Sequence, residues 1–211
     1  MSTTRVSHPV FARFYTWLSQ VLEHHGLAEH RQALLAGLSG PVIEVGAGNG
    51  LNFAHYPPSV TGVVAIEPEP RLRATAHRAA TRAPVPIEVT GGLAEQLPAA
   101  DASFDAAVVS FVLCSLADPG AALREMRRVL VPGGRLRFLE HVRADTPGWA
   151  RTQRLLDATV WPRLAGGCHT ARDSAAAIEA AGFTIEAEER FLFPAGVHSP
   201  ISFCIRGLAR R

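Results

Sequence analysis

Three glycines at alternate positions, Gly46, Gly48 and Gly50, follow a short β-branched run that ends at Val45. Glycine lets the backbone pass close to a ligand and adopt positive φ, and a helix that starts after such a loop offers free N–H groups. A dinucleotide-binding loop carries its third glycine one position later, where this chain has Leu51. The spacing therefore favours close contact between backbone and ligand, and it disfavours a pyrophosphate site.

A carboxylate ends the next β-branched run, at Glu67. In sheets of alternating strands and helices, an acidic residue about 20 positions after the first glycine lies where it can accept both hydroxyls of a ribose. Glu67 therefore predicts a ribose-binding carboxylate beside the glycine loop.

A histidine that ends a later predicted strand, His141, is the best-placed candidate for a general base. An unperturbed imidazole has a pKa of about 6.5 and so changes charge near neutral pH. The preceding Glu140 has two open interpretations: its carboxylate orients His141 or a cofactor amine, or it caps the next loop.

The cysteines Cys114, Cys168 and Cys204 are far apart in the chain, and no Cys-x-x-Cys pair occurs. This pattern favours neither a disulfide framework nor a thiolate zinc site, and no metal is expected. Cys114 is predicted to be a pocket-wall or core residue, and Cys204 a core residue. Cys168 and His169 follow a Gly-Gly pair and are candidates for contact with a substrate.

The candidate residues must be positioned by secondary structure, and the sequence shows strand patterns that alternate with helix patterns. Short apolar runs predict strands, and segments with apolar residues three to four apart predict helices. The predicted strands cover residues 42–45, 60–66, 87–89, 104–110 and 135–140; the predicted helices cover two segments within 9–38, then 71–81, 121–130 and 173–181, with a further helix after the glycine loop. The Pro132-Gly133-Gly134 segment is predicted to be a turn that follows a helix stop.

Such alternation predicts an α/β fold with a mostly parallel, Rossmann-like sheet and helices on both faces. Two final β-rich segments, 183–193 and 201–206, predict a hairpin at the sheet edge. Residues 1–38 are predicted to form an N-terminal helical cap, residues 39–211 the main domain, and residues 142–172 a cap-like insertion within it, in which Arg172 and Asp157 are expected to pair. The aromatic stripe of Phe11, Phe14 and Tyr15 is interpreted as helix packing or, alternatively, as a lid over a pocket.

Several short segments together resemble the class I S-adenosylmethionine-dependent methyltransferases, of the type 11 group. They are the glycine loop, Glu44 within the first strand, Glu67, the turn Ala94-Glu95-Gln96-Leu97-Pro98, Phe104-Asp105 and the segment from Arg128 to Gly134. The resemblance covers about residues 40–140. It implies a seven-stranded sheet with an antiparallel last strand, and S-adenosylmethionine as cofactor.

The resemblance also implies which residues contact the cofactor. The set comprises Glu44, Gly46, Ala47, Gly48, Gly50, Asn52, Glu67, Pro68, Leu93, Ala94, Glu95 and Ser110. Glu44 would help to organise the amino-acid end, and the glycines would pack against the methionine and ribose. Leu93 stands where an aspartate commonly contacts the adenine amino group, so adenine recognition is expected to use backbone and apolar contacts.

A narrower pattern is similar to the methyltransferase-like 7 group, whose members methylate alkyl thiols. It consists of Leu113-Cys114-Ser115-Leu116, Glu140-His141-Val142, Gln153 with Asp157 and Trp161, and Gly167-Cys168 with Arg172. The implied activity is methylation of a small, fairly apolar thiol, with Phe14, Tyr15, Cys114, Cys168 and His169 as candidate substrate contacts. Alternatives are methylation of an oxygen, nitrogen or lipid amine, a nicotinamide-dependent oxidoreductase, and a non-catalytic S-adenosylmethionine-binding protein.

The charge and the hydrophobicity of the chain indicate which classes of binding partner to expect. All 21 basic residues are arginines scattered along the chain and the formal charge is only +2, which disfavours a nucleic-acid groove. No apolar stretch approaches the ~20 residues of a membrane span, and no signal peptide pattern is present, so a cytoplasmic protein without a membrane span is expected. The oligomeric state is not indicated by the sequence.

Overall fold

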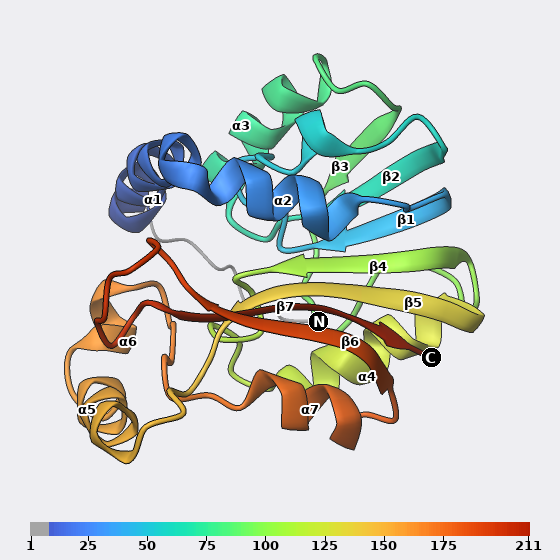
Figure 1. Cartoon of the computed structure of the whole chain (residues 1–211). Coiled ribbons are helices and arrows are strands. Elements are labelled where there is room, and N and C mark those ends of the chain that lie inside the picture. Colours follow the sequence, from blue (N-terminus) through green and yellow to red (C-terminus); the bar gives the residue numbers. More distant parts are fainter. Residues whose placement is uncertain (1–8) are drawn as a thin grey trace.

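A computed structural model of the chain, which describes residues 9–211, contains one seven-stranded sheet in the order β3-β2-β1-β4-β5-β7-β6 (Figure 1). The strands are β1 Gly40–Val45, β2 Val60–Ile66, β3 Ile87–Thr90, β4 Phe104–Ser110, β5 Leu130–His141, β6 Thr184–Leu192 and β7 Phe203–Arg210. Strands β1 to β5 pair in parallel, whereas β7 is antiparallel to both β5 and β6. The predicted fold, with its antiparallel last strand and edge hairpin, is confirmed.

Helices cover both faces of this sheet (Figure 1). The described helices, including those at the end of the sheet, are α1 Pro9–Leu22, the π turn η1 Glu23–Leu27, α2 Ala28–Leu35, the 3-10 turn η2 Phe53–His55, α3 Pro70–Ala80, α4 Pro119–Val129, α5 Pro147–Asp157, α6 Trp161–Leu164 and α7 Ser174–Ala180. Side chains alternate across a strand, so Ile43 and Val45 join one core with α4 and α7. Val42 joins the other core with α2 and α3.

Local capping explains where two of these helices begin. The Glu69 carboxylate accepts hydrogen bonds from the backbone N–H groups of Arg71 and Leu72, at 2.7 and 2.8 Å, and Pro70 occupies the first turn of α3. Asp118 accepts from the N–H of Ala121 at 2.9 Å and precedes Pro119 in the same way. The Glu69 cap sets the start of α3 at Pro70, so Glu67 at the carboxyl end of β2 lies outside the helix.

Two local predictions were wrong, and the interpretation of the aromatic stripe as helix packing does not extend to Phe14. The Pro132-Gly133-Gly134 segment lies inside β5, where the register with β4 shifts, so it forms an irregularity in a strand instead of a turn before one. After the glycine loop the chain makes only the short η2. The aromatic stripe of α1 does not pack as one face, because Phe14 and Trp17 are exposed; the side chain of Phe11 lies outside the described part of the chain.

One buried amide ties α5 to the residues that follow β5 and to the connection between β6 and β7. Gln153 of α5 accepts a hydrogen bond from the N–H of Ala144 at 2.7 Å and donates to the carbonyls of Val142 and Pro200 at 3.1 and 2.8 Å. Together with α1, helices α5 and α6 therefore lie at the end of the sheet where β1, β4 and β5 finish (Figure 1). Ligands of open α/β sheets bind at this end.

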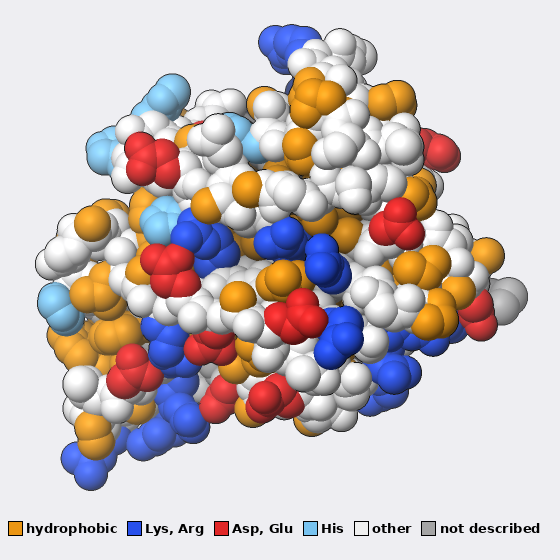
Figure 2. Space-filling view, turned by 45° about the vertical axis from the view of Figure 1, so that its right-hand side comes forward, with side chains coloured by type: hydrophobic (Ala, Val, Ile, Leu, Met, Phe, Trp, Pro, Cys, Tyr) orange, Lys and Arg blue, Asp and Glu red, His pale blue; other side chains and the backbone are white. Residues whose placement is uncertain are grey.

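The surface carries mixed charge. Figure 2 shows arginine and acidic side chains next to each other on one face. Ion pairs on the surface include Arg190 with Asp145 at 2.9 Å and Arg143 with Asp173 at 3.0 Å. Among the described helices, none combines the length and the apolar character needed to cross a bilayer.

Candidate active site

The glycine loop connects the end of β1 to η2 with positive φ at Gly46, Gly48 and Gly50, at 73°, 58° and 82°. A Cβ atom at Gly46 would lie 2.4 Å from Cγ2 of Val112, so only glycine fits between β1 and the segment after β4. The N–H groups of Gly46 and Ala47 donate to the carbonyl of Ile66 at 2.8 and 3.0 Å. The loop is therefore held against the end of β2.

Glu67 lies beside this loop, because β1 and β2 pair Val45 with Ile66 and both chains then leave the sheet together. One carboxylate oxygen accepts the N–H of Gly48 at 2.8 Å, and the other accepts the N–H of Glu69 at 2.9 Å. The side chain is buried, and burial raises its pKa. Each carboxylate oxygen can accept two hydrogen bonds, so capacity for two hydroxyl donors remains. This arrangement fits a ribose diol.

A buried polar network lies behind the glycine loop. The carboxylate of Glu44 accepts from the amide of Asn52 at 2.9 Å and from the hydroxyl of Tyr56 at 2.7 Å. Arg31 donates through Nη1 to Asn52 Oδ1 at 2.9 Å and to Ser110 Oγ at 3.0 Å. Glu44 thus fixes Asn52, and Asn52 joins Ser110 through one arginine.

Arg31 was missed by sequence reasoning. It is buried, and its Nε pairs with Glu23 at 3.0 Å. An arginine in a short helix gives no signal of its own, since its partners Asn52 and Ser110 lie in distant parts of the chain. Its guanidinium places a positive charge beside two residues predicted to bind cofactor.

Glu44 should make the stability of the fold depend on pH. Burial raises its pKa from 4.5 to about 7, against the lowering effect of its hydrogen bonds to Tyr56 and Asn52. The folded state therefore binds the proton more tightly than the unfolded chain, and the stabilisation that is complete below about pH 4.5 is lost as pH rises through 7. Between pH 5 and 8 the free energy of unfolding should fall, by on the order of 3 kcal/mol from this group.

Urea denaturation at a series of pH values measures this effect. Glu44→Gln keeps a hydrogen-bonding side chain without a titrating group, so its free energy of unfolding should vary less with pH than that of the wild type. Glu29→Gln is the matched control, because Glu29 is exposed on α2. An unchanged slope in Glu44→Gln would contradict the assignment.

Of the two aromatic residues predicted to contact substrate, only Tyr15 lies at the loop. A Cβ atom at Gly48 would be 3.4 Å from the Tyr15 ring, so this side chain of α1 packs on the loop next to Glu67. Burial raises the pKa of Tyr15, and the charge of Arg31 opposes that rise. Phe14 is 51% exposed and lies 6.1 Å from Trp17, measured between ring centroids, so the structure does not bring it to this site.

The predicted adenine side lies after β2 and β3. The carbonyl of Pro68 accepts from Arg73 at 3.1 Å, and the N–H of Glu67 donates to Thr90 at 3.0 Å. Leu93 forms an isolated bridge with Gln96, and Ala94 between them is buried, with Glu95 following in the same turn. The turn therefore presents backbone and apolar groups.

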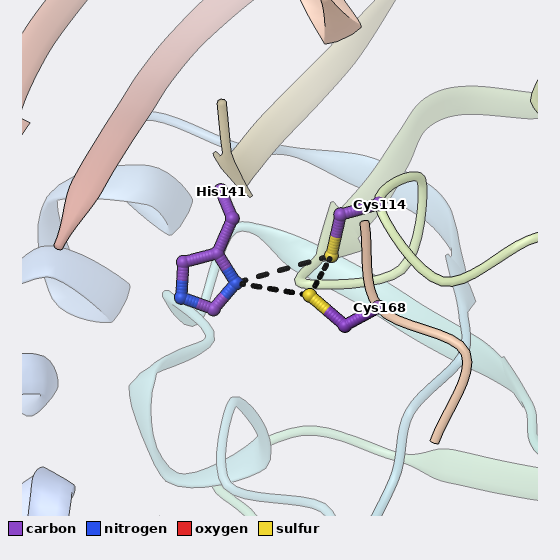
Figure 3. A group of neighbouring side chains, drawn as sticks. All are labelled: Cys114, His141 and Cys168. Atoms are coloured by element: carbon purple, nitrogen blue, oxygen red, sulfur yellow. Dashed lines mark hydrogen bonds between the residues drawn. The ribbon is translucent and has the colours of Figure 1, made fainter. Parts of the chain in front are cut away.

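A second cluster forms at the ends of β4 and β5 (Figure 3). Cys114 Sγ lies 3.7 Å from Cys168 Sγ, and His141 Nδ1 lies 4.0 Å from the first sulfur and 3.7 Å from the second. Both thiols are free and buried. The contact with Cys114 lowers the pKa of Cys168, while the contact with Cys168 raises the pKa of Cys114, so one thiol of the pair ionises first. Cys204 is a core residue, as predicted.

Glu140 caps the loop that carries Cys114. Its carboxylate accepts from the N–H groups of Val112 and Leu113 at 2.9 and 3.0 Å, and from that of Cys114 at 3.2 Å. Burial raises its pKa to about 7. Of the two interpretations of Glu140, the loop cap is the one that the structure confirms.

The segment that carries Cys168 is bonded to the same loop. The N–H of His169 donates to the carbonyl of Cys114 at 2.8 Å, and the guanidinium of Arg172 donates to the carbonyls of Leu113 and Leu116, both at 2.6 Å. The ring of His169 bonds the carbonyl of Gly167 at 2.8 Å.

The predicted pair of Arg172 with Asp157 was wrong, because Asp157 instead accepts the N–H groups of Thr170 and Ala171, each at 2.8 Å. Both side chains bond to backbone, which fixes the 168–172 turn.

Methyltransferases are among the known proteins whose sequences are similar to this chain. Residues 43–138 match the methyltransferase domain family. Human thiol S-methyltransferase TMT1A is 37% identical over 157 residues, which cover 71% of this chain and 63% of that protein. The ubiquinone/menaquinone biosynthesis C-methyltransferase UbiE of Rubrivivax gelatinosus is 34% identical over 125 residues, or 58% of this chain and 47% of that protein. The chain thus spans less than two thirds of the length of these relatives.

The fold has solved counterparts. A crystal structure from Thermotoga maritima, described as a SAM-dependent methyltransferase and possible histamine N-methyltransferase, superposes with a TM-score of 0.70 at 20% identity. The match covers 95% of this chain and 98% of that one.

Proposed function

We propose that the chain, whose residues 43–138 match the methyltransferase domain family, is a class I S-adenosylmethionine-dependent methyltransferase that methylates the sulfur of a small, fairly apolar thiol. The observation that carries the donor half of the proposal is Glu67, whose carboxylate bonds the N–H of Gly48 and keeps capacity for two hydroxyl donors. Support for the acceptor half comes from the relatives named as thiol S-methyltransferases.

The donor side is assigned to the loop and its neighbours. Glu67 would hold the ribose, the backbone of Gly46 and Gly48 would contact the sugar and methionine, and the turn at Leu93 and Ala94 would contact the adenine. When bound, S-adenosylmethionine supplies an electrophilic methyl group on a sulfonium. Arg31, held by Asn52 and Ser110, adds a cation suited to a carboxylate at the amino-acid end.

The acceptor side is assigned to the cluster of Cys114, His141 and Cys168. Methyl transfer from a sulfonium requires an aligned nucleophile in a site that excludes water. A thiol with a pKa near 8.5 is already a few per cent thiolate at neutral pH, whereas an aliphatic alcohol needs a strong dedicated base. His141, half-buried at the end of β5, would favour loss of the acceptor proton.

A matched set of acceptors tests the proposal. The protein is incubated with S-adenosylmethionine and with benzyl mercaptan, benzyl alcohol or benzylamine, and the products are measured by mass spectrometry. We expect methyl benzyl sulfide to form at least ten times faster than either other product. Faster methylation of the alcohol or amine would overturn the thiol assignment while leaving methyl transfer intact.

Two further outcomes would overturn methyl transfer itself. Binding of S-adenosylmethionine without any methylated product would favour a non-catalytic binding protein. Binding of NADH in its place would favour an oxidoreductase.

A further inference from the structure

The cluster at the ends of β4 and β5 has the ligand types of a metal site. It brings together two cysteine sulfurs and one imidazole nitrogen, all within 4.8 Å of one another. Each ligand comes from a separate segment: Cys114 from the loop after β4, His141 from the last residue of β5, and Cys168 from the turn after α6 (Figure 3). Two cysteines and one histidine form a known three-ligand set for zinc sites that keep one position open.

The distances between these atoms match a tetrahedral ion. With Zn–S bonds of about 2.3 Å and a Zn–N bond of about 2.0 Å, two sulfur ligands lie about 3.8 Å apart, and sulfur and nitrogen lie about 3.5 Å apart. The structure has 3.7 Å between the two sulfurs, and 3.7 and 4.0 Å from His141 Nδ1 to Cys168 and Cys114. A disulfide would need its sulfurs about 2.05 Å apart.

The surrounding groups hold the ligands in place. Glu140 accepts the N–H of Cys114, and the N–H of His169 donates to the carbonyl of the same cysteine. The indole N–H of Trp161, beside Cys168, is buried and has no hydrogen-bond acceptor among the described residues. Outer groups that orient ligands and donate toward a charged sulfur are the usual surroundings of a metal–thiolate site.

We propose that Cys114, His141 and Cys168 bind one Zn²⁺ ion, and that its open fourth position receives the sulfur of the acceptor thiol. The second half of this inference rests on the proposed thiol methylation, whereas the first half does not. Tyr15 connects the two sites, because its ring packs on Gly48 and Cys114 is one of the groups in its surroundings. The zinc site therefore borders the proposed donor site.

A zinc ion at this site would account for how the acceptor thiol loses its proton and how the methylated product leaves. On coordination the thiol loses its proton to water, because zinc binds the thiolate. The acceptor sulfur then forms a bond to the methyl carbon as the bond from that carbon to the sulfonium sulfur breaks, and the electron pair of the broken bond stays on the departing thioether. The methylated acceptor is a neutral thioether, a weaker zinc ligand than a thiolate, so it leaves the metal. His141 acts as a ligand in this scheme and not as a free base.

Metal analysis tests the first half. The full chain is purified without chelators, and its zinc content is measured by inductively coupled plasma mass spectrometry. We expect one equivalent of zinc, and at least a tenfold loss in Cys114→Ser, Cys168→Ser and His141→Asn. Cys204→Ala is the matched control, since Cys204 is a buried cysteine opposite His141 on β7 and lies outside the ligand triangle, and it should keep its zinc.

Cobalt substitution makes the result independent of the variants' folding. The wild-type protein loaded with Co²⁺ should show the sulfur-to-metal charge-transfer absorption and the intense visible bands of tetrahedral thiolate coordination. A wild-type protein that binds neither metal, whether its two thiols are free or joined as a disulfide, would overturn the inference. So would equal zinc loss in Cys204→Ala.

Adding a thiol to the Co²⁺-loaded protein tests whether the open fourth coordination position of the metal binds the acceptor sulfur. Benzyl mercaptan should shift the visible bands, and benzyl methyl sulfide should not; no shift with the thiol would overturn the acceptor assignment. The two proposals fail separately. Thiol methylation by a zinc-free protein at an undiminished rate would overturn the role of zinc in receiving the acceptor, whereas a zinc-loaded protein that methylates no thiol would overturn the proposed function and leave the metal site standing.

Discussion

Replacing Glu67 with alanine should weaken the binding of S-adenosylmethionine by about 100-fold, the largest functional effect that we expect from one side chain. The carboxylate would make charge-assisted hydrogen bonds to the ribose, each of which contributes about 1.5–3 kcal/mol. It also bonds the N–H of Gly48 at 2.8 Å, so its loss removes a contact that positions the glycine loop. Isothermal titration calorimetry of the variant and the wild type measures the difference.

The control for this variant lies two residues away. Glu69→Ala removes the side-chain cap of α3 but no group assigned to the ribose. It should lower the free energy of unfolding by about 1 kcal/mol and leave the affinity for S-adenosylmethionine within a factor of three. Equal affinities for Glu67→Ala and the wild type would refute the ribose role.

Replacing Glu140 with alanine should produce the largest loss of stability, about 3 kcal/mol or more. The carboxylate accepts hydrogen bonds from three consecutive N–H groups of the loop that carries Cys114. Each buried N–H left without an acceptor costs about 1–3 kcal/mol, and water entering the space offsets part of that cost. Urea denaturation at pH 7 measures the free energy of unfolding.

Glu179→Ala provides the comparison, because Glu179 is exposed on α7 and should change stability by less than about 0.5 kcal/mol. If Glu140→Ala is no less stable than Glu179→Ala, the loop cap does not stabilise the fold. The Glu140 variant should also bind less zinc, because the backbone of Cys114 is no longer held.

The sequence predicted the sheet well where the information is local. Residues 104–110 form β4 as predicted, because an uninterrupted apolar run of this length suits a strand buried on both faces. Glu67 could be placed next to Gly48 without coordinates, since parallel strands bring their carboxyl ends to one edge.

Contacts between distant segments could not be predicted in this way. Cys114, His141 and Cys168 were each predicted as site residues, but they are separated by 27 residues at each step, so nothing in the sequence indicated that they touch one another. The role of Arg31 could not be predicted for the same reason, because its hydrogen-bond partner Ser110 is 79 residues away. Arg172 and Asp157 were expected to pair by charge, yet nearby backbone groups satisfied each of them first. Which group a polar side chain bonds depends on tertiary packing. The spacing of apolar residues along the sequence does not reveal that packing.

We propose that methyl transfer to a thiol occurs where the glycine loop meets the cluster of Cys114, His141 and Cys168 at the ends of β4 and β5. The most direct test incubates the protein with S-adenosylmethionine bearing a trideuterated methyl group and with benzyl mercaptan. Mass spectrometry should detect benzyl methyl sulfide carrying all three deuterium atoms, in amounts that grow with time and fall sharply with Glu67→Ala. Absence of labelled sulfide at saturating donor and acceptor, from protein shown to be folded, would contradict thiol methylation by this chain.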